Sequence, residues 1–150
     1  MILERVDIFK TLERLQSNAS PAFGIMTPQH MVEHLVFSIR FSNEKEPQKL
    51  YFPLEKAEQI KSFVIYSDAE LPIGFKAPVL PKDELLPLSY QDLSSAIEML
   101  KLELDAFDSY FKLNPHNSPI NPTMGKLTHT EWIVFHNKHF KHHFKQFNLV

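Results

Sequence analysis

The segment from Thr128 to Phe147 constrains the fold of this chain more than any other part. Thr128 and Glu131 have the spacing of a capping box, which marks the start of a helix. At 100° per residue, one side of that helix carries a stripe about 60° wide on either side of its centre. The stripe contains Trp132, Phe135, His136, His139, His143, Gln146 and Phe147. Such a stripe predicts a helix that packs against other helices.

Helical spacing recurs in other parts of the chain, and only three glycines interrupt it. Long helices are expected at residues 3–15, 27–41, 89–111 and 128–147, with a short helix at 54–66. On the second helix, Glu33 and Arg40 mark the expected solvent side. The sequence therefore predicts an all-α fold, a four-helix bundle that forms a single domain of residues 1–150.

Residues 71–88 form a long Pro-rich crossover between the second and third long helices. Pro72, Pro78, Pro81 and Pro87 exclude a regular helix here. The segment is nevertheless apolar, so we expect it to pack across the domain surface or to form a wall of a substrate pocket.

Composition excludes several classes of partner. The net charge of −2 gives no reason to expect nucleic acid. Lys138, Lys141 and Lys145 are expected to form a solvated outer face. No apolar run approaches the roughly 20 residues that span a bilayer, and the N-terminus does not resemble a signal peptide, so we expect a cytoplasmic protein without a membrane partner. The absence of cysteine limits a metal site to nitrogen and oxygen ligands, and any thiol must arrive on a cosubstrate.

The histidines point to a metal site, because five of the eight fall between His129 and His143. His139 and His143 are one helical turn apart, so both imidazoles can reach one ion. A third ligand from another helix is expected, with His34 as the first candidate and His30 as the reserve. Alternatively, one histidine is a hydrogen-bonded core residue and the others line a wet cavity. His136 and His142 also compete for the ligand role, although His142 is expected at the edge of the bundle.

The remaining candidates have simpler interpretations. His116 and His129 lie in or beside loops and are expected to be solvated. Glu131 is explained by the capping box and is not expected to bind metal. If imidazoles bind the ion, metal affinity should fall as the pH drops through about 6.5, where free histidine titrates.

Two motifs resemble those of a known family. Residues 23–35, which lead to His34, resemble the W-S-x-x-E-x-x-x-H-L motif that opens the second helix of the DinB/YfiT-like metalloenzyme superfamily. His139-x-x-x-His143-x-x-Gln146 resembles the H-x-x-x-H-R-G-Q motif of its last helix. Residues 124–132 and 138–147 are similar to a small branch with G-K-L-T-x-x-E-W before K-H-x-x-H-H-x-x-Q-F. The histidines of the two motifs are about 105 residues apart, in the family's order.

The resemblance implies a four-helix bundle that binds one divalent metal through His34, His139 and His143. It thus favours these residues over His136 and His142. His136, His30, Gln146 and Trp132 are then expected to line the pocket or to support the ligands. A three-imidazole site favours Zn or Ni and also accepts Fe or Mn. Phe144 and Lys145 replace the family's Arg-Gly, so any role of that arginine is absent here.

The resemblance also implies a class of reaction. The superfamily includes transferases that use a low-molecular-weight thiol, so a thiol-dependent transferase acting on a small molecule is the first expectation. A metal-dependent hydrolase is the alternative, because a bound metal can activate water. A non-catalytic metal- or ligand-binding bundle is the third reading, and a homodimer is left open.

Overall fold

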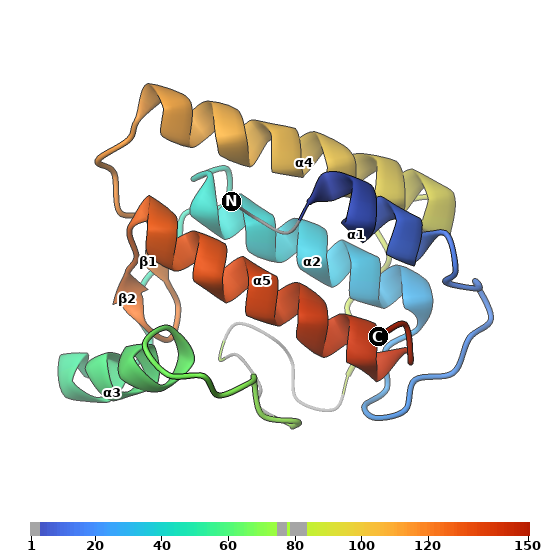
Figure 1. The fold of residues 1–150 in the computed structure, drawn as a ribbon, viewed down its shortest axis with the longest axis horizontal. Helices are drawn as coiled ribbons and strands as arrows, with labels where there is room; N and C mark the ends of the chain where they lie inside the picture. Colours follow the sequence, from blue (N-terminus) through green and yellow to red (C-terminus); the bar gives the residue numbers. More distant parts are fainter. Residues whose placement is uncertain (1–3, 75–77, 79–83) are drawn as a thin grey trace.

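The computed structural model describes residues 4–74, 78 and 84–150. This part of the chain is mostly helical, with five helices and one two-stranded sheet, which confirms the all-α class (Figure 1). The elements are α1 (Arg5–Leu12), α2 (Pro28–Ser42), α3 (Leu54–Val64), α4 (Leu93–Leu113), β1 (Ile120–Asn121), β2 (Gly125–Lys126) and α5 (His129–Gln146). Among the described residues, no helix is both long enough and apolar enough to cross a membrane.

Local capping residues set the starts of three helices. The Thr27 hydroxyl accepts a hydrogen bond from the backbone N–H of His30, with Pro28 at the first helical position of α2. Asp92 caps α4 in the same way. Thr128 and Glu131 form both bonds of a capping box at α5, as predicted.

The helix ends and the region before α5 differ from the sequence prediction. The helices α1, α3 and α5 end one to three residues earlier than expected, and α4 begins four residues later and ends two residues later than expected. Helix ends fray, and hydrophobic periodicity does not locate them closely. The unpredicted hairpin β1–β2 pairs Ile120 with Lys126 and Asn121 with Gly125. Gly125 has a φ of 77° there, which favours glycine. The predicted crossover lies partly outside the described residues, and its described parts contain no helix.

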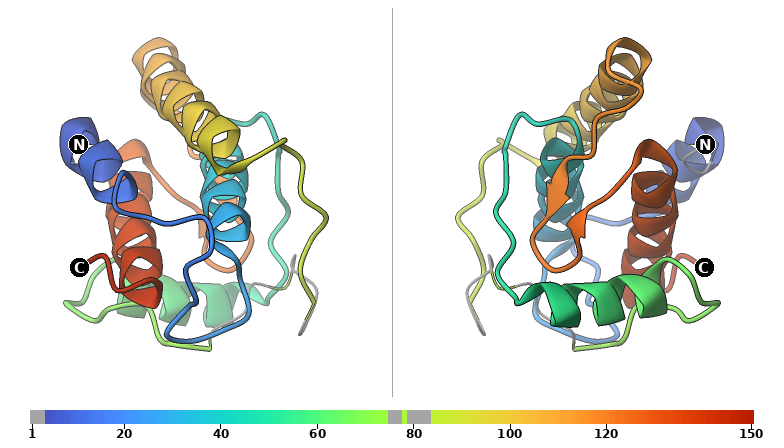
Figure 2. Two further views of the ribbon diagram at one scale, coloured as in Figure 1. Left: turned by 90° about the vertical axis from the view of Figure 1, so that its right-hand side faces the viewer. Right: turned by 90° about the vertical axis from the view of Figure 1, so that its left-hand side faces the viewer.

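The axes of α1, α2, α4 and α5 are roughly aligned, without regard to chain direction, around a common interior (Figures 1 and 2). The shorter α3 lies across one end of this arrangement, beside the hairpin (Figure 2). Two contacts show that α2 and α5 are antiparallel. His34 meets His139, whereas Ser42, two turns further along α2, meets His136 one turn earlier on α5.

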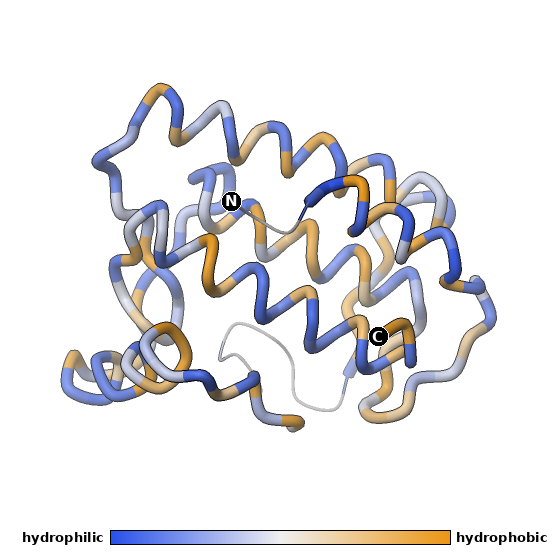
Figure 3. The backbone as a smooth tube through the Cα atoms, in the orientation of Figure 1, coloured by the Kyte–Doolittle hydropathy of each residue, from blue (hydrophilic) through white to orange (hydrophobic). Residues whose placement is uncertain are grey.

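The interior is built from one stripe of each long helix. Hydrophobic and hydrophilic residues alternate along α4 and α5, as amphipathic helices require (Figure 3). The largest fully buried side chains include Trp132 and Phe140 of α5, Phe107 of α4, and Ile8 of α1. This core fixes the positions of α2 and α5, which carry the histidines.

A buried carboxylate joins α2 to α4 and corrects one prediction. Glu103 is 2% exposed and pairs with Arg40 and Lys45, each at 3.1 Å, and with the Asn43 amide at 2.9 Å. Arg40 therefore faces a helix interface and is only partly exposed to solvent. Glu33, the other expected solvent-side residue, accepts the backbone N–H groups of Ser89 and Tyr90 before α4.

Candidate metal centre

Three histidines from α2 and α5 converge on one point. The Nε2 atom of His139 lies 2.9 Å from Nε2 of His34 and 3.1 Å from Nε2 of His143. The possible ligand atoms of all three lie within 4.8 Å of one another, so the group can hold a metal ion. In a tetrahedral site with bonds of about 2.0–2.1 Å, ligand nitrogens are about 3.3 Å apart. The two distances from Nε2 of His139 are slightly shorter than that value.

The helices bring these residues together by their spacing and register. His139 and His143 face the same side of α5 because they are four residues apart. The Ser42–His136 contact sets the register of α2 against α5 and places His34 opposite them. Phe135 stacks on the His139 ring, with centroids 5.2 Å apart, and limits its rotation. The predicted convergence of the three histidines is confirmed.

The hydrogen-bonding capacity of the three ring nitrogens favours a shared cation. The single Nε2 position of His139 can either donate one proton or accept one in the ring plane, so it makes a good hydrogen bond to only one neighbour. A cation between the rings would use all three lone pairs. Nδ1 of His34 and of His139 is then protonated, buried and without a hydrogen-bond partner among the described residues, which is a cost that bound metal must offset.

Gln146 fixes the proton position on His143. The Gln146 side-chain N–H donates to the carbonyl oxygen of Phe23 at 3.1 Å, so its Oε1 faces the imidazole. That Oε1 lies 2.8 Å from Nδ1 of His143, which must therefore carry the proton. The Nε2 lone pair of His143 is left for a ligand, the usual arrangement around a metal-binding histidine. Gly24 makes room for Gln146, because a Cβ at this position would lie 3.0 Å from its Nε2.

Burial keeps the three imidazoles neutral. It lowers the pKa of His34 to about 4, with a smaller contribution from the charge of His142. Burial also lowers the pKa of His139 and His143 well below the usual value, and the neighbouring histidines lower it further. Neutral imidazole is the form that binds metal.

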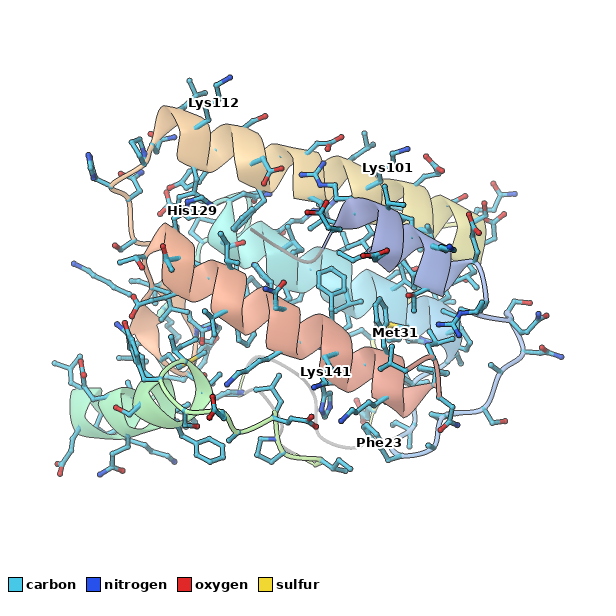
Figure 4. The ribbon with its side chains drawn as sticks, viewed as in Figure 1. Phe23, Met31, Lys101, Lys112, His129 and Lys141 are labelled. Carbon is cyan, nitrogen blue, oxygen red and sulfur yellow. The ribbon has the colours of Figure 1, made fainter. Side chains whose placement is uncertain are left out.

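A cavity of about 280 Å³ adjoins the three histidines. Most of its wall is apolar, with Phe37 and Phe41 from α2, Ile60 and Val64 from α3, and Phe135 from α5. The loop at Phe23 forms part of the rim and lies beside the end of α5 (Figure 4). A ligand in this cavity would have direct access to an ion held by the imidazoles.

Of the supporting residues predicted from sequence, the cavity wall includes His30 and Gln146. The Thr27 hydroxyl lies 2.6 Å from Nδ1 of His30, and the Leu86 carbonyl oxygen lies 3.0 Å from its Nε2. His142, expected at the edge of the bundle, is half-buried in this wall, with Nδ1 3.3 Å from the carbonyl oxygen of Leu71. The helical stripe placed His142 at the edge of the inward face, and the 71–74 segment covers that edge.

His136 and Trp132, expected to line the pocket or to support the ligands, lie in the core and are not among the described residues of the cavity wall. The Ser42 hydroxyl donates to the carbonyl of Ile39 at 2.7 Å and so accepts from Nε2 of His136 at 2.8 Å. The His136 ring also stacks on Trp132, with centroids 5.3 Å apart. His136 is thus a hydrogen-bonded core histidine, and burial lowers its pKa to about 3.

The remaining candidates agree with their predicted roles only in part. His116 is exposed, as expected, but His129 is half-buried and stacks on Phe111 with centroids 4.4 Å apart. Glu131 is engaged by its capping box and also by Tyr66 and Lys61, which supports its exclusion as a ligand.

The lysines of α5 are less free than expected. Nζ of Lys138 donates to the carbonyl oxygens of Val64, Ser67 and Ala69 at the end of α3. Lys141 and Lys145 are exposed and both pair with Glu70. The lysines therefore hold the 65–70 segment, which leads into the cavity wall, against α5.

Comparison with protein family models, with curated proteins and with solved structures found no match to this chain.

Proposed function

We propose that this chain is a divalent-metal-dependent enzyme of the DinB/YfiT-like four-helix-bundle type, with His34, His139 and His143 as the metal ligands. The observation that carries the proposal is the convergence of three imidazoles, of the buried His139 and His143 and the half-buried His34, beside a cavity. Among the described residues, this is the one group of three or more histidines or carboxylates arranged to hold an ion. The resemblance of the two histidine motifs to that superfamily supports the same ligand set.

The position of the cavity favours a catalytic site over a structural one. Structural sites are usually closed by four protein ligands, whereas catalytic sites use three and keep a position for water or substrate. Bound there, Zn²⁺ or Ni²⁺ would supply a Lewis acid that stabilises a thiolate or activates a water molecule. The chain's own residues orient the ligands through Gln146 and limit the access of water through the apolar wall.

A thiol-dependent transfer is the reaction that we propose, with the low-molecular-weight thiol as a cosubstrate. The resemblance supports it, and the chain contains no cysteine of its own. In such a transfer the thiol gives up its proton, its sulfur bonds to an electrophilic carbon, and the leaving group departs with the electron pair of the broken bond.

Metal content tests the ligand set. The purified protein is loaded with Zn²⁺ or Ni²⁺ and dialysed. Elemental analysis by mass spectrometry should then find about one ion per chain. Replacing His34, His139 or His143 with Ala should remove most of that metal. The exposed His116→Ala is the matched control and should retain it. Full metal retention by His34→Ala would contradict the proposed site.

Turnover tests the reaction class. Metal-loaded protein should accelerate conjugation of activated electrophiles to a thiol, and chelation should abolish the acceleration. Turnover of activated esters without a thiol would instead identify a hydrolase. Metal binding without turnover in either panel would identify a non-catalytic metal-binding bundle.

A further inference from the structure

The polar groups of the cavity wall are largely used within the protein. Asn121 Oδ1 accepts hydrogen bonds from the backbone N–H and hydroxyl of Thr123 and from the Met124 N–H. His30 bonds to Thr27 and Leu86, and Gln146 to His143 and Phe23. A ligand rich in hydroxyl or amide groups would lose its hydrogen bonds to water and recover few, at a cost of about 1–3 kcal/mol for each unpaired group.

The charges beside the cavity also restrict the ligand. Its described lining contains no lysine or arginine, and its one carboxylate, Glu84, is exposed. Among these described lining residues, a phosphate or sulfate at the apolar end would thus find no lysine or arginine to pair with. Imidazole is a neutral ligand, in contrast to a carboxylate or thiolate, so a divalent ion held by three imidazoles would keep its full charge and favour an anion at its open position.

The apolar part of the wall extends away from the histidines. On α2 it runs from His34 through Phe37 to Phe41, a rise of about 10 Å. Ile60 and Val64 of α3 and Met124 after the hairpin add further apolar surface. This length suits an alkyl chain or one aromatic ring with a short linker.

We infer that the site takes a small amphiphile, with a single anionic head group, a carboxylate or thiolate, on an apolar body without further polar groups. The inference rests on the proposed function, because the head group binds the metal. It disfavours thiols with sugar or peptide bodies and favours a substrate with a hydrocarbon body.

A series of carboxylates, titrated into Co²⁺-loaded protein, separates the contribution of the head group to binding from that of the apolar body. Acetate, butanoate, hexanoate and octanoate share one head group, and gluconate adds hydroxyl groups to a six-carbon body. The visible spectrum of Co²⁺ reports head-group binding, and calorimetry gives the affinity. Affinity should rise about fourfold for each added methylene, and gluconate should bind no more tightly than acetate. An affinity independent of chain length, or tight binding of gluconate, would overturn the inference.

Two substitutions on α3 locate the body of the ligand. Ile60 lies in the cavity wall, whereas Phe63 is 47% exposed and is not among the lining residues. Ile60→Asp should abolish the dependence on chain length and leave acetate binding unchanged, and Phe63→Asp should preserve both. If Ile60→Asp does not fold, Ile60→Ala should weaken octanoate binding several-fold without affecting acetate; equal weakening of both would overturn the inference. Failure to bind Co²⁺ would instead contradict the proposed function.

Discussion

Oε1 of Gln146 lies 2.8 Å from Nδ1 of His143, and this contact determines which nitrogen of that imidazole is available to a metal. The bond orients the ring and fixes its tautomer. Outer partners of this kind typically contribute 10–100-fold to metal affinity. Gln146 is therefore expected to act on the metal through His143 and not as a ligand itself.

Replacing Gln146 tests this role. Gln146→Met has a similar length but cannot accept the imidazole proton, so metal affinity should fall by about 10–100-fold while about one ion per chain still binds at saturation. Competition with a chromophoric chelator measures the change. The exposed Gln59→Met on α3 serves as a control and should bind like the parent. Unchanged affinity in Gln146→Met would show that the contact does not position His143.

Lys138 is expected to stabilise the end of α3 and the segment after it. Its ammonium group donates to three carbonyl oxygens, at 2.6 Å for Val64 and 2.8 Å for Ser67 and Ala69. Lys138→Met should lower the free energy of unfolding by about 2 kcal/mol, since hydrogen bonds to a charged group are worth about 1.5–3 kcal/mol and this site is partly solvated. Hydrogen exchange of residues 61–70 should also become faster.

Lys141→Met provides the matched comparison on the same helix. Lys141 pairs with Glu70, and both side chains are more than half exposed, so the loss should be below about 1 kcal/mol. Equal destabilisation by the two substitutions would mean that the three carbonyl contacts add nothing beyond a surface ion pair.

The starts of α2 and α5 could be predicted from the sequence because capping is local. Thr27 and Thr128 each bond to a backbone N–H three residues later, within reach of sequence reasoning. The start of α4 was wrong by four residues, because Asp92 and not Ser89 caps that helix.

The α5 stripe placed His139 and His143 together. The pairing of these two histidines with His34 depends on the register of two helices that are far apart in the sequence. Helical spacing alone left that register open, and the family resemblance supplied it.

Long-range partners could not be predicted in this way. Lys138 and Arg40 looked solvent-facing because each belongs to the polar side of its own helix, yet α3 and α4 bring acceptors to them. His136 shares the inward stripe of the metal candidates, but Ser42 and Trp132 surround it. Periodicity gives the side of a helix and does not identify what covers that side.

Glu103 is expected to be important for stability without any role in metal binding. It is 2% exposed and pairs with Arg40 and Lys45. Glu103→Gln should cost about 3 kcal/mol, near the low end for a broken buried pair, because Arg40 and Lys45 keep 28% and 51% exposure. Urea unfolding measures the loss, with the exposed Glu98→Gln on the same helix as the control.

The same carboxylate should contribute to the loss of stability in acid. Burial raises the pKa of Glu103, but the bonds from Asn43, Lys45 and Arg40 outweigh burial and leave it below the ordinary value. Its contribution is thus present above the unfolded pKa of about 4.3 and is lost as the pH falls through the folded value. Glu103→Gln should be correspondingly less sensitive to acid than the parent, and an unchanged acid profile would contradict this assignment.

Metal affinity should depend on pH less than the sequence predicts. Free histidine titrates near 6.5, which suggested that binding would weaken there. In the folded protein, burial lowers the pKa of His34 to about 4 and lowers that of His139 and His143 well below the usual value. Protons therefore compete with metal for the folded site only at lower pH, and the dissociation constant should change by less than about threefold between pH 7.5 and 6.0.

As the pH falls, the stability of the metal-free protein should decrease before the metal affinity does. Unfolded imidazoles take up protons near pH 6.5, whereas the buried ones do not until the pH is much lower, so the unfolded state binds more protons in this window. The free energy of unfolding should then fall steadily from about pH 7 toward pH 5 after chelation. Calorimetric metal titrations and urea unfolding at matched pH values measure the two effects separately. His116→Ala should follow the parent in both, because this histidine is exposed. A tenfold or greater loss of metal affinity between pH 7 and 6, with constant stability of the metal-free protein, would mean that the three imidazoles are solvated and titrate freely.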